Sequence, residues 1–441
     1  MRDLNTKDLR EFIKYVFLNV LGMLGLSCYI LADTFFVSKG LGANGLTALN
    51  LAIPVYSFIH GSGLMIGMGA GTKYSIYQSQ EKKKEANEIF TNAVYLAGAF
   101  AVIFFIQGCF FSKRMAQMLG ADENVLEMTK TYLQVILLFA PAFLMNNVLL
   151  CFVRNDGAPN ISMAAMVTGS LSNVVLDYIF IFPLNMGIFG AVLATGFAPL
   201  ISIGVLSIHF WKKRNQFHFV RCSVWLAEIK GICLSGIPSL ITEVASGVVM
   251  IIFNMIILKL QGNIGVAAYG VIANLSLVII SVYTGIAQGM QPIMSSSFGS
   301  GNLKKVQRIL KYGLVLMGMI SLGIYLVIFL CAAPLTAIFN SEGNVMLQKI
   351  AEQGMKIYFL ACPFVGFNII LSVYFTSVDC PLPANVISIL RGIIVIIPLT
   401  FLMAAIAKMT GVWLSFPLTE GCVATIGAGF LMVTKKKMLF K

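Results

Sequence analysis

Charged residues are scarce in this sequence. Only 11% of the 441 residues are Asp, Glu, Lys or Arg, whereas 58% are hydrophobic. An ordinary soluble domain has about 25% charged and about 45–50% apolar residues, so this composition excludes a soluble globular protein. Apolar stretches of 20 or more residues recur along the chain, and each is long enough to cross a hydrocarbon core of about 30 Å as a helix. The chain is therefore predicted to be an all-α integral membrane protein.

Several site motifs are also missing. The sequence contains no G-x-x-x-x-G-K-[S/T] motif, which argues against ATP hydrolysis within the chain. The nine cysteines form no C-x-x-C pair and mostly lie in apolar runs, as small buried side chains do. The histidines, His60, His209 and His218, have neither a helical pairing nor a cysteine partner, so neither a metal site nor a cofactor is expected.

Apolar runs between charged, Gly-rich or Pro-rich breaks divide the chain into twelve predicted membrane helices. The first six are residues 12–38, 46–72, 89–111, 131–153, 160–183 and 188–211. The second six are residues 231–259, 266–297, 312–333, 354–377, 384–406 and 411–434. One long polar connection separates the two sets, so we predict an N-terminal lobe of residues 1–211, a linker of residues 212–230 and a C-terminal lobe of residues 231–441.

The two halves of the chain resemble each other. "GANGLTAL" from Gly42 reappears as "GNIGVAAY" from Gly262, at an offset of 220 residues, and Pro159 has its counterpart in Pro381 at an offset of 222. A nearly constant offset at separated places indicates two homologous lobes. Because each lobe has an even number of spans, both lobes are expected to have the same orientation in the membrane.

The basic residues are distributed unevenly between the predicted loops. One side of the membrane carries 22 Lys and Arg residues and the other carries eight. Basic loops remain in the cytoplasm, so both termini are predicted to be cytoplasmic. The net charge of +13 is explained by this bias. The lipid bilayer is therefore the expected partner, and nucleic acid is not.

Four acidic residues fall well inside predicted spans: Asp33, Asp177, Glu243 and Glu420. A charge at the centre of a bilayer costs about 2.5–3.5 kcal/mol on insertion scales, so such a residue is expected to face the protein interior with a partner and often has a function. Glu420 and Arg391, the basic residue within the eleventh run, are expected to be structural, with Arg391 paired to a carboxylate or to loop carbonyls.

A cation or proton site is predicted around Asp177. Asn173 lies four residues earlier, one helical turn away on the same face, and Asp33 and Thr195 are the other oxygen-bearing side chains that a six-helix lobe could bring to that point. Such a set of oxygen donors suits either Na⁺ or a proton shared between two carboxyl groups, and the sequence leaves this choice open. The alternative is that the two acids only hydrogen-bond helices together.

At this point the chain resembles a known family, the multidrug and toxic compound extrusion (MATE) transporters, in particular their MepA-like bacterial branch. The resemblance covers "ADTFFVSKGLGANGLTALN", "VRNDGAPNISM", "SNVVLDYIFIF", "GIPSLITEV" and "GMQPIMSSSFGSGNLKK". In that family a first-span Asp, an Asn, an Asp four residues later and a Thr eighteen residues beyond form the cation or proton site of the N-terminal lobe. Asp33, Asn173, Asp177 and Thr195 match this pattern one by one.

The resemblance implies further site residues. Glu243 matches a position at which some members have a coupling acid in the C-terminal lobe, although a helix-packing hydrogen bond is an equal alternative. The family holds its substrate in a cavity between the lobes, for which the candidate lining residues are Tyr56, Met145, Asn146, Asn147, Gln288 and Gln291. The chain departs from some members because residues 12–38 contain no Pro at which the first span could bend, only Gly22 and Gly25.

The predicted function is secondary antiport. The chain is expected to act as a monomer without enzymatic activity, exporting amphipathic, often cationic small molecules in exchange for H⁺ or Na⁺. One alternative is a lipid-linked saccharide flippase of the same superfamily, although few basic residues lie within the spans. A membrane-embedded enzyme that uses Asp33 and Asp177 as an acid pair is less favoured because no third catalytic partner is evident, and an uncoupled channel is least favoured.

Overall fold

The computed structural model of the chain describes residues 2–222, 226–340 and 343–439, and all regular structure in these ranges is helical. The first half contains α1 (Arg2–Ser79), α2 (Lys83–Phe110), α3 (Ser112–Met118), α4 (Leu126–Leu138), α5 (Ala140–Asn155), α6 (Pro159–Ile181) and α7 (Gly187–Trp211). The second half contains α8 (Leu226–Gly299), α9 (Leu303–Phe339), α10 (Val345–Tyr358), the 3₁₀ turn η1 (Phe359–Ala361), α11 (Cys362–Ser377), α12 (Pro381–Ile389), the π-helical turn η2 (Leu390–Ile394) and α13 (Ile396–Leu439).

The helices make the twelve predicted spans. Within the described ranges, nine units are long and apolar enough to cross a membrane when the bent pair α4 and α5 counts as one. Three of these units are hairpins of two spans, because α1 breaks at Gly42, α8 at Gly262 and α13 at Ala407 and Lys408. All three breaks fall in the short gaps that the sequence predicts between spans.

Gly42 and Gly262 show why these hairpins need glycine. Gly42 has φ 65° and ψ −158°, and Gly262 has φ 64° and ψ −157°. This region of backbone conformation is accessible almost only to glycine, because a Cβ atom would collide with the neighbouring peptide groups. The two residues are the first letters of the repeated motif, so the internal repeat specifies the same backbone turn twice.

Two predicted spans are less regular than the sequence suggests. The span predicted at 131–153 is bent by 47° between α4 and α5. Pro141, in the first turn of α5, explains the bend, because proline lacks an N–H group and its ring clashes with the preceding helical turn. The span predicted at 384–406 contains the π-helical turn η2, which carries Arg391.

The first span has no break before Gly42. Gly22 and Gly25, the predicted flexible points, instead face α6: a Cβ atom on Gly22 would lie 2.9 Å from the sulfur of Met166, and one on Gly25 would lie 3.6 Å from Val167. These glycines therefore allow α1 and α6 to approach each other closely in this straight arrangement.

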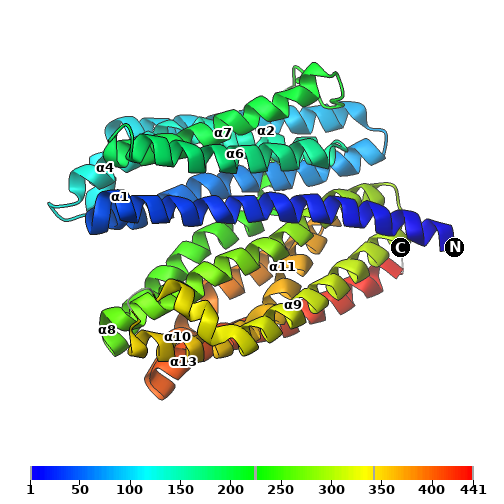
Figure 1. The fold of residues 1–441 in the computed structure, drawn as a ribbon. Helices are drawn as coiled ribbons and strands as arrows, with labels where there is room; N and C mark the ends of the chain where they lie inside the picture. The colour runs from blue at the N-terminus through cyan, green and yellow to red at the C-terminus, as the bar shows by residue number, and fades with distance from the viewer. Residues whose placement is uncertain (1, 223–225, 341–342, 440–441) are drawn as a thin grey trace.

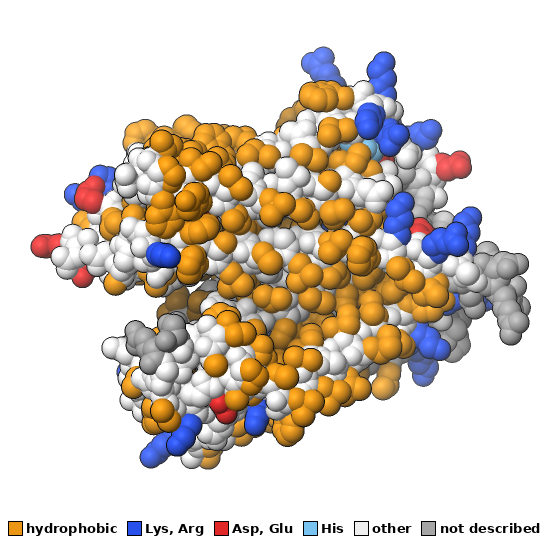
Figure 2. Space-filling view, viewed as in Figure 1, with side chains coloured by type: hydrophobic (Ala, Val, Ile, Leu, Met, Phe, Trp, Pro, Cys, Tyr) orange, Lys and Arg blue, Asp and Glu red, His pale blue; other side chains and the backbone are white. Residues whose placement is uncertain are grey.

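The helices form two lobes, one above the other in Figure 1, with α1 to α7 in the first and α8 to α13 in the second. Each lobe has its own core of buried apolar side chains. Apolar side chains also cover the outer surface in a broad band across both lobes (Figure 2), as expected for a surface that faces lipid. Lys and Arg side chains gather at the end where the termini lie.

The lobes contact each other at the end near the termini. Close packing is visible at two glycines of α8, since a Cβ atom on Gly285 would lie 2.7 Å from the Val20 Cα atom and one on Gly289 would lie 2.7 Å from the Val16 Cα atom. Ser27 donates a hydrogen bond to Ser281 across the same contact. Toward the opposite end a cavity lies between the lobes, and Figure 2 shows the surface hollowed there.

Ion pairs reinforce this contact. Lys305 of α9 lies 2.7 Å from Glu11 of α1, and Lys73 of α1 lies 3.3 Å from Glu228 of α8. The described part of the predicted linker, residues 212–222, packs on the first lobe through Phe217, which belongs to that lobe's core.

Candidate functional site

The four residues of the predicted cation or proton site lie together in the first lobe. Asp33 comes from α1, Asn173 and Asp177 from α6, and Thr195 from α7. All four are buried, and the Asp177 side chain is inaccessible to solvent. The carboxyl groups of Asp33 and Asp177 lie within hydrogen-bonding reach of each other. The spacing in the sequence therefore predicted a cluster that the three helices do assemble.

The Asn173 amide supports this pair. In the orientation that satisfies both ends of the amide, its nitrogen donates to Asp177 Oδ2 at 3.0 Å and its oxygen accepts from the backbone N–H of Thr195 at 3.2 Å. The Thr195 hydroxyl donates to the backbone carbonyl of Ala191 at 3.2 Å. The Asn173 amide oxygen and the Thr195 hydroxyl therefore already have protein partners. Asn173 presents an N–H donor to the acid pair rather than an oxygen ligand.

The two carboxyl groups have no basic partner in the part of the chain that the structure describes. Neither Asp33 nor Asp177 takes part in an ion pair among the described residues, and Oδ1 of each acid has no hydrogen-bond partner there. Two adjacent carboxylates in an apolar interior repel each other and lose hydration, so this arrangement favours binding a positive charge between them.

Tyr132 of α4 is a neighbour of the acid pair that the sequence did not suggest. Its buried phenol lies within hydrogen-bonding reach of Thr195 and close to both carboxyl groups. Tyr29, one helical turn before Asp33, is also near Asp33 and shares a hydrogen bond of 2.6 Å with Tyr56. A tyrosine one turn from a membrane acid is a signal that could have been used, whereas Tyr132 has no such local marker.

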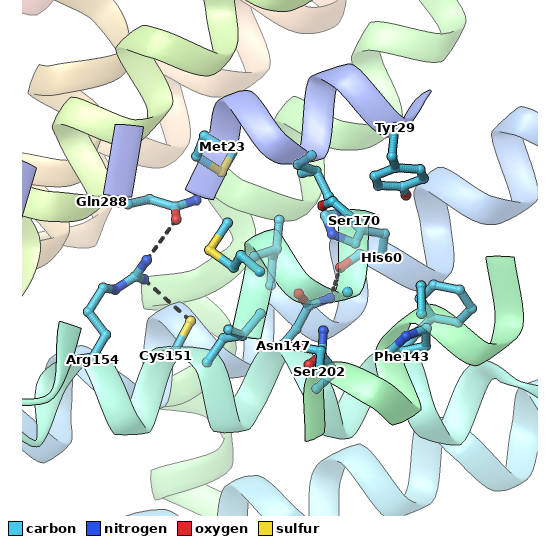
Figure 3. Close-up of a pocket in the computed structure, with 18 of the residues that line it drawn as sticks. Met23, Tyr29, His60, Phe143, Asn147, Cys151, Arg154, Ser170, Ser202 and Gln288 are labelled. Carbon is cyan, nitrogen blue, oxygen red and sulfur yellow. Dashed lines mark hydrogen bonds between the residues drawn. The ribbon is translucent and has the colours of Figure 1, made fainter. Parts of the chain in front are cut away.

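Four of the six predicted cavity residues lie around one cavity next to this site. Tyr56, Asn146, Asn147 and Gln288 line it, with an empty volume of about 720 Å³. Figure 3 shows Tyr29 and Phe143 at one end and Arg154 with Gln288 at the other. The Asn147 amide donates to the backbone carbonyl of His60 at 3.3 Å.

Met145 and Gln291 lie elsewhere. Met145 packs against the core of the first lobe. Gln291 is fully buried and donates hydrogen bonds to Thr72 and Asn155, each at 3.1 Å. Met145 precedes Asn146 on the same helix, and its side chain points about 100° away from that of Asn146, toward the core of the first lobe.

Arg154, in the last turn of α5, lines the same cavity. From the sequence, Arg154 was only one of the basic residues that place a loop in the cytoplasm, because it directly follows an apolar run. Its side chain is 2% exposed, and it donates from Nη1 to Asn19 at 2.9 Å and to Gln288 at 2.8 Å. Gln288 belongs to the second lobe, so this arginine also joins the two lobes.

Glu243, the predicted coupling acid, lies at the interface between the lobes. One of its carboxylate oxygens is 3.7 Å from Nδ1 of His60 on α1. It lines a second cavity, which lies between the lobes and shares Gln288 with the first. His60 also stacks on Tyr56, with ring centroids 5.8 Å apart.

Arg391 and Glu420 form a buried ion pair in the second lobe. Glu420 Oε1 accepts from Arg391 Nε at 3.0 Å and from Nη2 at 2.8 Å, and Oε2 accepts from Asn368 at 2.7 Å. Of the two partners predicted for Arg391, a carboxylate or loop carbonyls, the structure shows the carboxylate of Glu420. Among the described residues, no group of three or more His, Cys, Asp or Glu side chains has the arrangement of a metal site.

Two similar lobes of membrane helices, with buried acids and a cavity between them, define a multi-pass membrane transporter. A model of the MatE family matches residues 20–179 and 238–402, which together make up most of the chain and include the spans that carry Asp33, Asp177 and Glu243. The chain belongs to this family, the multidrug and toxic compound extrusion transporters.

Known proteins resemble the chain in sequence and in fold. The multidrug export protein MepA of Staphylococcus aureus (strain MRSA252) is 25% identical over 410 residues, which are 92% of this chain and 89% of MepA. An outward-facing structure of a multidrug resistance MATE family transporter has a TM-score of 0.91 at 22% identity and covers 98% of this chain and 96% of its own. A MOP superfamily transporter from Pyrococcus furiosus has a TM-score of 0.90 at 22% identity, with the same coverage.

Proposed function

We propose that this chain is a secondary antiporter that exports amphipathic, often cationic organic compounds in exchange for protons. The observation that carries this proposal is the buried pair of Asp33 and Asp177, which has no basic partner among the described residues and lies next to an aromatic cavity. The likeness to MepA, a multidrug export protein, supports the substrate class. Aromatic faces and polarisable sulfur atoms suit lipophilic cations.

The coupling ion is proposed to be H⁺ rather than Na⁺. The carboxyl groups are close enough to share a proton, and the Asn173 amide presents its N–H group to Asp177. A sodium ion would need several oxygen ligands, but the amide oxygen of Asn173 is already bonded to the backbone of Thr195. These contacts favour H⁺, because a proton needs only the two carboxyl groups as partners.

The proposed cycle follows alternating access. With the termini in the cytoplasm, the cavity between the lobes faces the outside, and protonation of the acid pair there removes a charge and allows the helices of the first lobe to repack. This weakens drug binding, so the drug leaves outside and the proton is released to the cytoplasm after the lobes reverse. Coupling requires that the two states differ in affinity for both ligands. Glu243, at the interface of the lobes, is proposed to contribute to this difference.

The proposed setting is the cytoplasmic membrane of a bacterium. The gathering of basic side chains at the end of the molecule with both termini (Figure 2) supports cytoplasmic termini. One copy of the chain encloses both cavities with its own two lobes, which supports a functional monomer.

The test is efflux of a fluorescent cation, rhodamine 123, from proteoliposomes with imposed pH and Na⁺ gradients varied separately. We expect an inward pH gradient to drive transport in the wild type and a Na⁺ gradient alone not to drive it. Asp33→Asn and Asp177→Asn should abolish gradient-driven transport, because each removes one of the two groups that share the proton. Glu123→Gln is the matched control, since Glu123 is an exposed acid.

Three results would contradict the proposal. Full pH-driven transport by both asparagine variants would remove the acid pair from the mechanism. Transport that follows only the Na⁺ gradient would identify Na⁺, and not H⁺, as the coupling ion. Conversion of a substrate without any gradient would favour the membrane-embedded enzyme instead.

A further inference from the structure

We propose that Arg154 is the anion-binding subsite of the central cavity, so that the transported compounds include zwitterionic amphiphiles with a carboxylate. This inference rests on the proposed export function and names a substrate class within it. Arg154 is a cation at the end of the cavity opposite the aromatic side chains (Figure 3), and it lies outside the acid pair that would bind the proton.

The hydrogen bonds of Arg154 leave one edge of the guanidinium without an oxygen partner. Nη1 donates to the side-chain oxygens of Asn19 and Gln288. Within the part of the chain that the structure describes, Nη2 has only sulfur partners, Met68 Sδ at 3.2 Å and Cys151 Sγ at 3.5 Å, and sulfur is a weak acceptor. Nε has no acceptor among the described residues. Nε and Nη2 together form the edge on which a carboxylate binds with two parallel hydrogen bonds.

Arg391 shows what the same edge does when an acid is available. Its Nε and Nη2 both donate to Glu420 Oε1, at 3.0 and 2.8 Å. The two arginines are similarly buried, with Arg391 12% exposed in its side chain and Arg154 2% exposed. The difference is therefore the missing carboxylate at Arg154 rather than the degree of burial.

The nearest acid along the chain cannot fill this role. Asp156 is two residues away, but its Oδ1 accepts from the Tyr74 hydroxyl at 2.6 Å. Its Oδ2 is 2.8 Å from His209 Nε2 and accepts from the backbone N–H of Gln216 at 2.9 Å. Both oxygens of Asp156 thus already have partners, Oδ1 within the first lobe and Oδ2 in the first lobe and the linker.

A buried cation without an opposite charge is unfavourable, because it loses hydration and gains no Coulomb attraction. The sulfur and amide contacts of Arg154 offset only part of that loss. A ligand carboxylate at Nε and Nη2 would supply both the missing charge and the missing acceptors. The site thus favours ligands that bring a negative group.

The opposite end of the cavity suits a positive group. Tyr29, Tyr56 and Phe143 line it there, and aromatic faces attract organic cations. Glu243 lines the adjoining cavity, which shares Gln288 with this one. A compound with a cationic aromatic body and a carboxylate would therefore find an opposite charge or an aromatic face at each end.

Two dyes that differ by one methyl group test this inference. Rhodamine 110 is a zwitterion with a free carboxylate, and rhodamine 123 is its cationic methyl ester. Binding of each dye to the purified transporter at neutral pH is measured by fluorescence polarisation, for the wild type, Arg154→Gln, Arg154→Lys and the control Arg114→Gln, which changes an exposed arginine.

We expect the wild type to bind rhodamine 110 at least as tightly as rhodamine 123. Arg154→Gln should weaken rhodamine 110 binding about tenfold or more, because a charge-assisted bidentate contact is lost, and change rhodamine 123 binding by less than about twofold. Arg154→Lys should recover part of the loss, since the charge remains without the planar fork. Arg114→Gln should match the wild type for both dyes.

Several outcomes separate this inference from the proposed function. If the wild type binds rhodamine 123 but binds rhodamine 110 more than tenfold more weakly, the inference fails while the export function stands. This comparison uses only the wild-type protein, so it does not depend on whether a variant folds. If Arg154→Gln weakens both dyes equally, Arg154 is a bridge between the lobes only. If the wild type binds neither dye, the inference and the proposed substrate class fail together.

Discussion

Ionisable side chains inside the membrane helices differ in what balances their charge. Arg391 and Glu420 neutralise each other. Within the described ranges, Asp33 and Asp177 are two acids that face each other without a base, and Arg154 has amide and sulfur partners but no acid. The Arg391–Glu420 pair is neutral and needs no further charge. The charges of the acid pair and of Arg154 can be balanced by a ligand that binds and dissociates. The three therefore separate into one structural pair and two candidate binding sites.

The structural pair gives a prediction about stability. Glu420→Gln should leave Arg391 buried without its counter-charge, which costs about 3–5 kcal/mol when one partner of a buried pair is removed. We expect a large drop in the melting temperature of the purified protein, measured by the fluorescence of a thiol-reactive dye or by circular dichroism.

The double variant Arg391→Met with Glu420→Leu is the control. It removes both charges and fills their space with apolar groups, which is often neutral or stabilising. It should therefore be more stable than Glu420→Gln alone. A double variant as unstable as the single one would show that shape, not charge balance, dominates at this position.

The sequence predicts residue types at these positions better than it predicts their partners. The high cost of an acid in a membrane span led to Asp33, Asp177, Glu243 and Glu420, and all four lie in the interior or at the interface of the lobes. Arg154 was interpreted as a loop charge because it ends an apolar run. Its burial depends on Asn19 and Gln288, residues 135 and 134 positions away in the chain, which no local pattern connects.

At the scale of elements, the hairpins of α1 and α8 are the most predictable feature of the fold. Their breaks at Gly42 and Gly262 have nearly the same φ and ψ, as the repeated motif suggests. The bend between α4 and α5 and the π-helical turn at Arg391 were not predicted, because average hydrophobicity over a span does not register a local change in helix geometry. Pro141 is the one visible cue for the bend.

The hairpin of α8 can be tested with two glycines of the same helix. Gly262→Ala should destabilise the protein by about 1–3 kcal/mol, because alanine disfavours the positive φ of this position. Gly270→Ala is the matched control. Among the described residues, no atom beyond the adjacent residues and the local helix backbone would lie within 4 Å of an added Cβ at either position, but only Gly262 has positive φ.

Thermal unfolding of both variants measures the difference. Gly270→Ala should be neutral or slightly stabilising, since alanine favours a helix interior by about 0.5–1 kcal/mol. Equal melting temperatures for the two variants would mean that the hairpin can adopt another backbone turn at no cost.

At the scale of the whole molecule, the two lobes pack closely at one end and separate at the other. The close end has glycine contacts between α1 and α8, the Ser27–Ser281 hydrogen bond and the ion pairs of Lys305 and Lys73. Each of these contacts has to break if the cavity is to open toward the termini.

A cross-link at this contact should stop transport. Ser27→Cys with Ser281→Cys, in a background without the nine native cysteines, places two thiols where the hydroxyl groups already touch, so a disulfide can form with little backbone movement. Oxidised protein should lose gradient-driven efflux of rhodamine 123 from proteoliposomes, and a reducing agent should restore it.

The single variants under the same oxidant are the controls and should transport normally. Unchanged efflux from fully cross-linked protein would mean that the lobes do not separate at Ser27 during the cycle, and that the contact is permanent.

The first helix belongs to both lobes. Phe12 and Val16 are part of the core of the second lobe, whereas Asp33, farther along the same unbroken helix, completes the acid pair of the first. If the lobes move apart as the proposed cycle requires, this helix cannot stay with both of them and remain straight. Either it bends between Val16 and Asp33, or its far end pulls Asp33 away from Asp177. The distance between two carboxyl groups deep in one lobe is thus tied to the angle between the lobes.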